Sequence, residues 1–264
     1  MRLPIYQVDA FTDSLFGGNP AAICPLDAWL PDATMQAIAA ENNLAETAFF
    51  VREGDGYALR WFTPTVEVDL CGHATLASGH VVMNFLEPGR HSVSFRTLKA
   101  GTLVVERRRD RLVMDFPARP AEPAEAPGGL LAALGGNPRE VLRARDHLVV
   151  YGTAAEIAAL KPDLVALANV DCWAAIVTAP GEDAIDFVSR FFAPAQGVAE
   201  DPVTGSSHTT LTPYWAKRLG KTELEARQLS PRGGALSCTL NGDRVNIAGH
   251  AVLYLEGQIH VPSR

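Results

Sequence analysis

Polar and apolar positions alternate in short runs along the first half of the chain, a spacing typical of β-strands. Turn residues bound these runs, and the positions between them are rich in Val, Leu and Phe. The pattern predicts a strand-rich half built from several short strands. The clearest of these strands cover residues 59–62, 92–95, 103–107 and 112–116.

Two segments of the same half have helical spacing instead. In residues 32–42, Met35 and Ala39 lie one helical turn apart after Asp32, so we expect an outer amphipathic helix with Asp32 as its N-cap. Residues 73–85 leave almost no polar face, which predicts a helix buried on most sides. A mixed sheet wrapped around one central helix is the expected result.

A second buried helix is expected in the other half, from about Ser206 through Trp215. Pro213 lies beyond its first turn. Because proline has no backbone N–H and its ring clashes with the preceding turn, we expect this helix to kink or break there.

Four segments of the first half recur in the same order in the second half, at a nearly constant offset of about half the chain. Chance supplies one such match easily but not four in order, so we infer two copies of one structural unit. The matched segments are 60–64 with 190–194, 71–74 with 204–207, 101–104 with 234–237, and 110–114 with 243–247.

The repeat defines the expected domain organisation. We predict an α+β fold with two pseudo-symmetric lobes, residues 1–118 and 119–250, and an active site in the cleft between them. The Pro-, Ala- and Gly-rich stretch 118–129 is the expected connection. Residues 251–264 follow the end of the repeat, and we expect them to cross back to the first lobe.

Composition narrows the function classes. The net charge of −7 argues against nucleic-acid binding. No run approaches the roughly 20 apolar residues that span a membrane, so we expect no membrane partner. The four cysteines are far apart and form no CxxC pair, which argues against a disulfide scaffold or a structural zinc site and favours the cytoplasm.

The sequence also lacks the motifs of nucleotide-binding enzymes. The sequence has no GxGxxG motif after a strand and no phosphate-binding loop, so we expect no nucleotide cofactor. Cys71, His73 and at most His80 are too few to predict a metal site. The expectation is therefore an enzyme or binder without cofactor or metal.

Both predicted buried helices begin at small residues, Gly72-His73 and Gly205-Ser206. The start of a helix offers unpaired N–H groups and the positive end of the helix dipole, so it can bind an anion. If the two copies face each other, their helix starts can hold one carboxylate. The alternative is two capped helices with a purely structural role.

Longer motifs at 8–11, 16–21, 43–49, 69–77 and 200–206 together resemble the PhzF-like (phenazine-biosynthesis-like) family. The resemblance implies a diaminopimelate-epimerase-like fold and an isomerase that moves a proton between carbons of a small carboxylate substrate without a cofactor. It also implies a monomer or homodimer.

The resemblance also implies roles for single residues. Glu46 matches the family's catalytic carboxylate, and His73 and Asp201 match polar residues beside the proton path. The turns Gly72-His73 and Gly205-Ser206 match those that hold the substrate carboxylate.

The residues themselves support these roles unequally. Glu46 interrupts an otherwise small or apolar run, and burial of a carboxyl group raises its pKa and suits it to passing a proton in both directions. His73 is a natural proton partner or orienter beside it. Asp201 reads as a turn residue on sequence alone, and His80 and His208 read as structural.

Three other functions remain open. Cys71 stands where a two-cysteine amino-acid epimerase or racemase has one of its acid/base groups, but Thr204 at the partner position is too weak an acid and base. A Cys/Thr pair resembles hydroxyproline dehydratases of the same fold, so a lyase is the second hypothesis. A non-catalytic small-molecule binder is the third.

Overall fold

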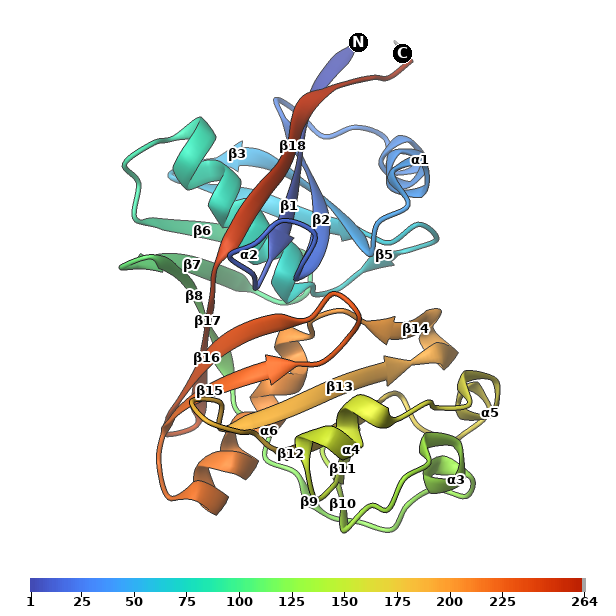
Figure 1. The fold of residues 1–264 in the computed structure, drawn as a ribbon. Helices are drawn as coiled ribbons and strands as arrows, with labels where there is room; N and C mark the ends of the chain where they lie inside the picture. Colours follow the sequence, from blue (N-terminus) through green and yellow to red (C-terminus); the bar gives the residue numbers. More distant parts are fainter. Residues whose placement is uncertain (263–264) are drawn as a thin grey trace. The chain divides into compact units, whose positions relative to one another are not determined.

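One buried helix lies at the centre of each half of the chain (Figure 1). The computed structural model describes residues 1–262. It forms two units. Unit 1 consists of Met1–Asp115 and the chain from Ala248 onward, and unit 2 is Phe116–Ile247. The sequence-based boundaries, at 118/119 and 250/251, lie close to these divisions, and positions 263 and 264 of the predicted return segment are outside the described residues.

Unit 1 is a mixed sheet around helix α2. Strands β1 and β2 are antiparallel, β2 and β3 are parallel, and β4 pairs with β3 on one side and parallel with β6 on the other. Its elements are β1 (Arg2–Ala10), β2 (Asn19–Leu26), α1 (Asp32–Asn42), β3 (Glu46–Glu53), β4 (Gly56–Phe62), β5 (Glu67–Val68), α2 (Gly72–Val81), the π-turn η1 (Val82–Leu86), β6 (Ser92–Thr97), β7 (Thr102–Arg108), β8 (Arg111–Pro117) and β18 (Ala251–His260).

Unit 2 repeats this plan around helix α6. Strands β11 and β12 are parallel, β13 pairs antiparallel with β12, and β13 pairs parallel with β15. Its elements are β9 (Glu122–Pro123), α3 (Leu130–Leu134), β10 (Glu140–Arg143), β11 (His147–Val150), α4 (Ala154–Ala159), α5 (Leu164–Ala168), β12 (Ala175–Pro180), β13 (Phe187–Ala193), the 3₁₀ turn η2 (Pro194–Gln196), β14 (Val198–Asp201), α6 (Gly205–Leu219), β15 (Glu223–Gln228), β16 (Gly234–Asn241) and β17 (Arg244–Gly249).

The predicted α+β fold with two pseudo-symmetric lobes is confirmed by this order of elements. Strands β1–β8 and β10–β17 follow one another with the same pairings, and Gly72 and Gly205 are the first residues of equivalent helices. The predicted strands of the first half are also present. Strands β9 and β18 are equivalent too. Strand β9 follows the hairpin β7–β8 and pairs with β10, the first strand of unit 2, while β18 follows the hairpin β16–β17 and pairs with β1, the first strand of unit 1.

Helix α2 is buried along almost its whole length, as its apolar sequence predicts. It packs against β1, β2, β3 and β7. Gly79 lets it approach β7 closely, because a Cβ built at Gly79 would lie 2.6 Å from a methyl of Val105. The last predicted turn is a π-turn rather than α-helix. The central helix therefore fits its sheet with little spare room.

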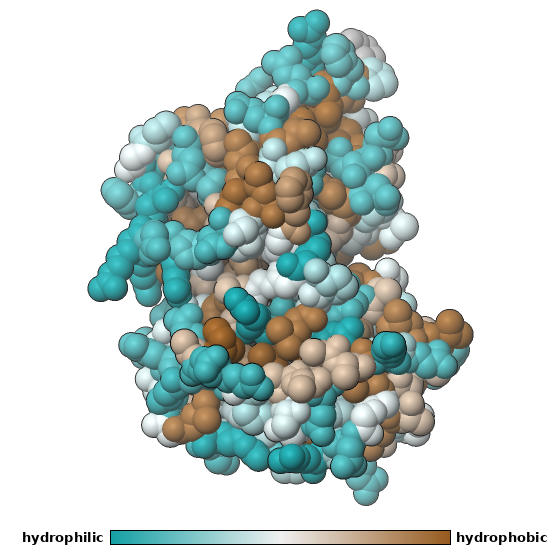
Figure 2. Space-filling model, in the orientation of Figure 1, coloured by the Kyte–Doolittle hydropathy of each residue, from teal (hydrophilic) through white to brown (hydrophobic). Residues whose placement is uncertain are grey.

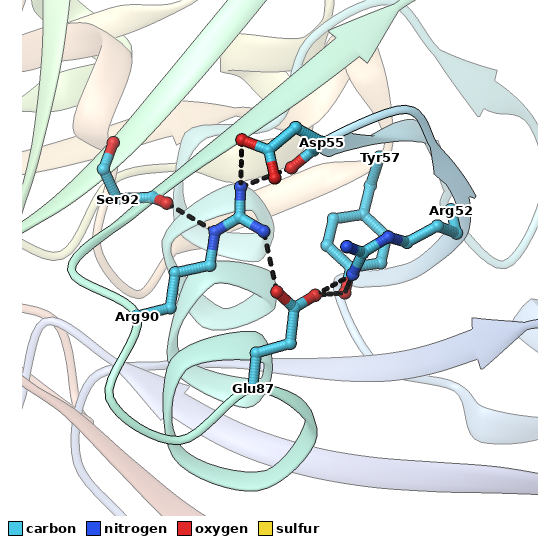
Figure 3. Close-up of polar contacts among 6 residues, drawn as sticks. All are labelled: Arg52, Asp55, Tyr57, Glu87, Arg90 and Ser92. Carbon is cyan, nitrogen blue, oxygen red and sulfur yellow. Dashed lines mark hydrogen bonds and ion pairs between the residues drawn. The ribbon is translucent and has the colours of Figure 1, made fainter.

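A polar network fixes the chain directly after this helix (Figure 3). Glu87 accepts hydrogen bonds from Arg52 and Tyr57 of the β3–β4 hairpin and forms a 2.7 Å ion pair with Arg90. Arg90 also reaches the hairpin turn at Asp55. Since the Glu87 carboxylate directly follows η1 and bonds to side chains of β3 and β4, the network fixes the end of the α2–η1 segment against this hairpin.

Two predicted details differ from the structure. Pro31, not Asp32, is the N-cap of α1, and the Asp32 carboxylate instead pairs with Arg60 at 2.8 Å. Helix α6 runs unbroken through Pro213. The carbonyl of Thr209, which Pro213 cannot bind, accepts a hydrogen bond of 2.9 Å from the backbone N–H of Arg119, so the helix continues without an unsatisfied carbonyl.

Helix length and exposed apolar side chains are the features that relate to the predicted location and partners. None of the helices in the described part of the chain is long and apolar enough to cross a membrane. Exposed apolar side chains gather on β18 and on the loop between β1 and β2, where Phe16 contacts Tyr254 beside Leu255 (Figure 2). A homodimer and a cytoplasmic location stay predictions.

Candidate active site

Glu46, Cys71 and His73 come together in unit 1. Glu46 begins β3 and pairs with Ala21 of β2, while Cys71 is the N-cap of α2 and His73 its second residue. Because α2 packs on β2 and β3, its start lies over the start of β3. Nε2 of His73 is 3.3 Å from the Glu46 carboxylate, and Nδ1 is 3.5 Å from the Cys71 sulfur. The imidazole ring therefore lies between a thiol and a carboxylate.

This cluster is largely shielded from solvent. The His73 side chain is 7% exposed and that of Glu46 is 18% exposed. In the small or apolar run that Glu46 interrupts, Ala48 and Phe49 are buried, but Ala45 is exposed. Glu46 is thus a partly buried carboxylate with one open side, where a small molecule can approach it.

Burial determines the protonation state of His73. It lowers the pKa of His73 to about 3, although a backbone hydrogen bond with Pro20 acts in the opposite direction. The ring is therefore neutral near pH 7, with one nitrogen as donor and the other as acceptor. A neutral imidazole can orient a neighbouring group, but it lacks the second N–H proton that makes the imidazolium cation a general acid.

The same three residues offer a nitrogen, a sulfur and an oxygen within 4.8 Å of one another, a spacing that could hold a metal ion. However, Cys71 and Glu46 face opposite nitrogens of the His73 ring. A histidine binds one ion through one nitrogen, so an ion on that nitrogen would face only one of the other two groups.

Asp201, Thr204, Gly205 and Ser206 form the equivalent region of unit 2. Asp201 ends β14, Thr204 is the N-cap of α6, and Gly205 and Ser206 are its first residues. The Thr204 hydroxyl donates a hydrogen bond of 2.5 Å to the Asp201 carboxylate. The Thr204 hydroxyl therefore links the start of α6 to the Asp201 carboxylate at the end of β14.

Gln228, the last residue of β15, completes this region and was missed by the sequence analysis. Its side chain is fully buried and binds both Thr204 and the backbone of Asp201. No motif marks it, because a glutamine at a strand end has no sequence signature. Only its equivalence to Thr97, the last residue of β6, could have drawn attention to this position.

The two helix starts share a feature that favours anion binding. Among the described residues, neither the Cys71 side chain nor the Thr204 side chain makes an N-cap hydrogen bond to its helix. The first backbone N–H groups of a helix have no partner within the helix. Both starts therefore keep donors and a positive dipole end for a ligand.

His80 and His208 behave as structural groups, as expected. Burial lowers the pKa of His80 and of His208 to about 4. Nδ1 of His208 binds the carbonyl of Thr204 at 2.8 Å, which packs the ring under the turn.

A cavity of about 370 Å³ in unit 1 lies beside Gln7 and Asn42, and the Glu46 cluster does not line it.

Solved structures define the class of this fold. A phenazine biosynthesis protein of the PhzF family from Enterococcus faecalis superposes with a TM-score of 0.95 at 46% identity, over 99% of this chain and 100% of the other. A predicted epimerase from Pseudomonas aeruginosa shares the fold, with a TM-score of 0.71 at 20% identity over 98% of this chain and 100% of the other. The fold is therefore the one that PhzF-family proteins share with the predicted epimerase.

Sequence comparison gives the family. The family model described as phenazine biosynthesis-like protein matches residues 8–257. A Pseudomonas aeruginosa protein named an uncharacterized isomerase is 56% identical over 99% of this chain and 100% of its own length. The chain belongs to this phenazine biosynthesis-like (PhzC-PhzF) family, and the predicted family and isomerase class are confirmed.

Proposed function

We propose that this isomerase moves a proton between two carbons of a small carboxylate-bearing substrate, with Glu46 as the acid/base group and no cofactor. The carrying observation is the 3.3 Å contact between the Glu46 carboxylate and the buried, neutral His73 ring. A partly buried carboxylate with a fixed orientation has the geometry of a proton carrier.

The proposed reaction needs one proton and one carboxylate. Glu46 removes a proton from one carbon, and the electron pair of the broken C–H bond enters the neighbouring unsaturated system of the substrate. The new Glu46 carboxyl group then returns the proton to a second carbon, where that electron pair forms the new C–H bond. The His73 ring, whose Nε2 lies 3.3 Å from the carboxylate, is proposed to orient it, and burial limits exchange with water.

We assign substrate binding to the two helix starts. Gly72 and His73 of α2, with Gly205 and Ser206 of α6, are proposed to hold the substrate carboxylate through backbone N–H groups. Asp201 is proposed to act beside the proton path. The support for this assignment is that these turns are equivalent in the duplicated fold and that neither is capped by its own side chain in the described residues.

The test is carbon–deuterium exchange in deuterated water with a panel of small cyclic and unsaturated carboxylic acids. Glu46→Gln keeps the shape and removes the base, so exchange should fall by about 10²–10⁴-fold while binding of the same acid changes little. Glu53→Gln, at the exposed end of the same strand, is the matched control and should exchange like the wild type. Full activity of Glu46→Gln would sink the proposal.

The epimerase or dehydratase alternative rests on one observation, the contact of Cys71 with His73. Against it, the group at the partner position is the Thr204 hydroxyl, which donates a hydrogen bond to Asp201 and is too weak an acid and base to oppose Cys71. Cys71→Ala should therefore be mild in the exchange assay. Loss of exchange in Cys71→Ala together with normal exchange in Glu46→Gln would support that alternative. Binding of an acid without any exchange would indicate a non-catalytic binder.

A further inference from the structure

We propose that Thr204 and Gln228 are positioning residues that fix the Asp201 carboxylate for the reaction. The inference rests on the proposed function, because it needs Asp201 to act on the substrate. Its observations all lie inside unit 2 and do not depend on the other half of the chain.

Thr204 is the central residue of this arrangement. Its hydroxyl donates to Oδ2 of Asp201 at 2.5 Å and accepts from Nε2 of Gln228 at 3.2 Å. A hydroxyl has one proton, so a donor on its acceptor side directs that proton toward the carboxylate. The carboxylate is thereby held in one rotation by a short charge-assisted hydrogen bond.

Gln228 fixes Thr204 in turn. Its Oε1 accepts from the backbone N–H of Thr204 at 2.9 Å, and its Nε2 donates to the backbone carbonyl of Asp201 at 2.8 Å. The side chain is fully buried, and burial of an amide is unfavourable unless its groups are bonded. Its hydrogen bonds go to the two ends of the turn that carries Asp201.

The N-cap position shows what this arrangement replaces. Threonine at an N-cap usually accepts a hydrogen bond from the second or third N–H of its helix. The Thr204 hydroxyl makes no such bond within the described residues and faces Asp201 instead. The Thr204 hydroxyl thus orients the Asp201 carboxylate instead of capping α6, and the first N–H groups of the helix stay available for an anion.

Unit 1 provides an internal comparison. Thr97 occupies the position equivalent to Gln228, and its hydroxyl binds the carbonyl of Gly101 at 2.8 Å, closing a strand connection. The duplicated fold therefore does not require a glutamine at this strand end. The amide occurs in the copy that contains Asp201.

The test compares Thr204→Val, Thr204→Ser and Gln228→Met by deuterium exchange with the panel acid that the wild type exchanges fastest. Thr204→Val and Gln228→Met keep the size of the side chain but lose the hydrogen bonds. We expect kcat for exchange to fall about 10–100-fold, while the dissociation constant of that acid changes less than about 3-fold. Thr204→Ser keeps the hydroxyl and should recover most of the rate. Thr97→Val is the matched control and should exchange like the wild type.

Backbone amide spectra separate misplacement from unfolding, because α6 must keep its amide shifts in every variant that is compared. If Gln228→Met does not fold, the contrast between valine and serine at position 204 still decides. Asp201→Asn distinguishes the two levels of the proposal. Reduced exchange in Asp201→Asn with normal exchange in Thr204→Val overturns the positioning role alone. Unchanged exchange in both Asp201→Asn and Glu46→Gln, or no exchange by the wild type, overturns the proposed function as well.

Discussion

At the scale of single residues, protonation connects the site to stability. His73 and His208 are both buried, and burial lowers their pKa values to about 3 and about 4. An unfolded histidine titrates near 6.5. Below that pH the unfolded chain binds more protons than the folded one, so folding stability decreases as the pH falls from about 6.5 toward 4.

His208→Asn tests this dependence without changing the proposed chemistry. The asparagine amide can donate to the Thr204 carbonyl as the His208 ring does, but it does not titrate. The slope of unfolding free energy between pH 6.5 and 4.5 should decrease by up to about 1.4 kcal/mol per pH unit. Urea melts at several pH values measure it. Above pH 7 the wild type and the variant should differ by a constant, and an unchanged slope below pH 6.5 would contradict the assignment.

The candidate site shows which residues sequence can identify. Glu46 and His73 lie in motifs, and the polar residue within an apolar run is visible without a structure. Gln228 was missed because it reaches Asp201 and Thr204 across a helix and a strand, and only the register of β15 brings them together. Long-range hydrogen bonds of this kind leave no local pattern.

At the scale of elements, the central helices and their starts were predictable, but two local details of the helices were not. Apolar residues on all sides identify α2 as buried. Of the kink or break expected at Pro213, the break does not occur, and a distant backbone donor, the Arg119 N–H, satisfies the carbonyl of Thr209. The Asp32 cap was wrong because Arg60 binds that carboxylate. In both cases a tertiary contact overrode a correct local preference.

The tight contact between α2 and β7 gives a prediction with a change of sign. Alanine normally stabilises a helix relative to glycine by about 1 kcal/mol. At Gly79 the new methyl would lie 2.6–3.1 Å from the Val105 side chain, so we expect Gly79→Ala to destabilise the protein by about 1–3 kcal/mol. In the background of Val105→Ala the same change should cost less, because the methyl contacts at 2.6 and 3.1 Å are lost while the 2.8 Å contact with Cβ of residue 105 stays. Denaturant melts of the four proteins of this double-mutant cycle measure both effects, and additive changes would refute the close contact.

At the scale of the whole molecule, duplication made the fold predictable. Matched segments such as 71–74 and 204–207 occupy equivalent helix starts, so the two-lobed fold could be inferred from the repeat alone. The register of β18 could not. Its pairing with β1 shifts at a bulge between Gln7 and Val8, and no feature of residues 251–260 fixes where such an irregularity occurs.

The last strand gives a test of how unit 1 is completed. Strand β18 pairs with β1 from Arg2 to Ala10, whereas β2 pairs with β1 only from Tyr6 onward. A chain that ends at His250 therefore lacks the partner that β18 provides to the first residues of β1. We expect fast amide hydrogen exchange at residues 2–5 of β1 in this truncated chain, with protection retained in β12 and β13 of unit 2. A synthetic peptide of residues 251–262 should restore protection of β1 by strand addition, and the same peptide with Leu253→Pro should not, because proline cannot donate to the ladder. Equal loss of protection in both units, or no effect of the intact peptide, would show that β18 does not complete unit 1 as an exchangeable strand.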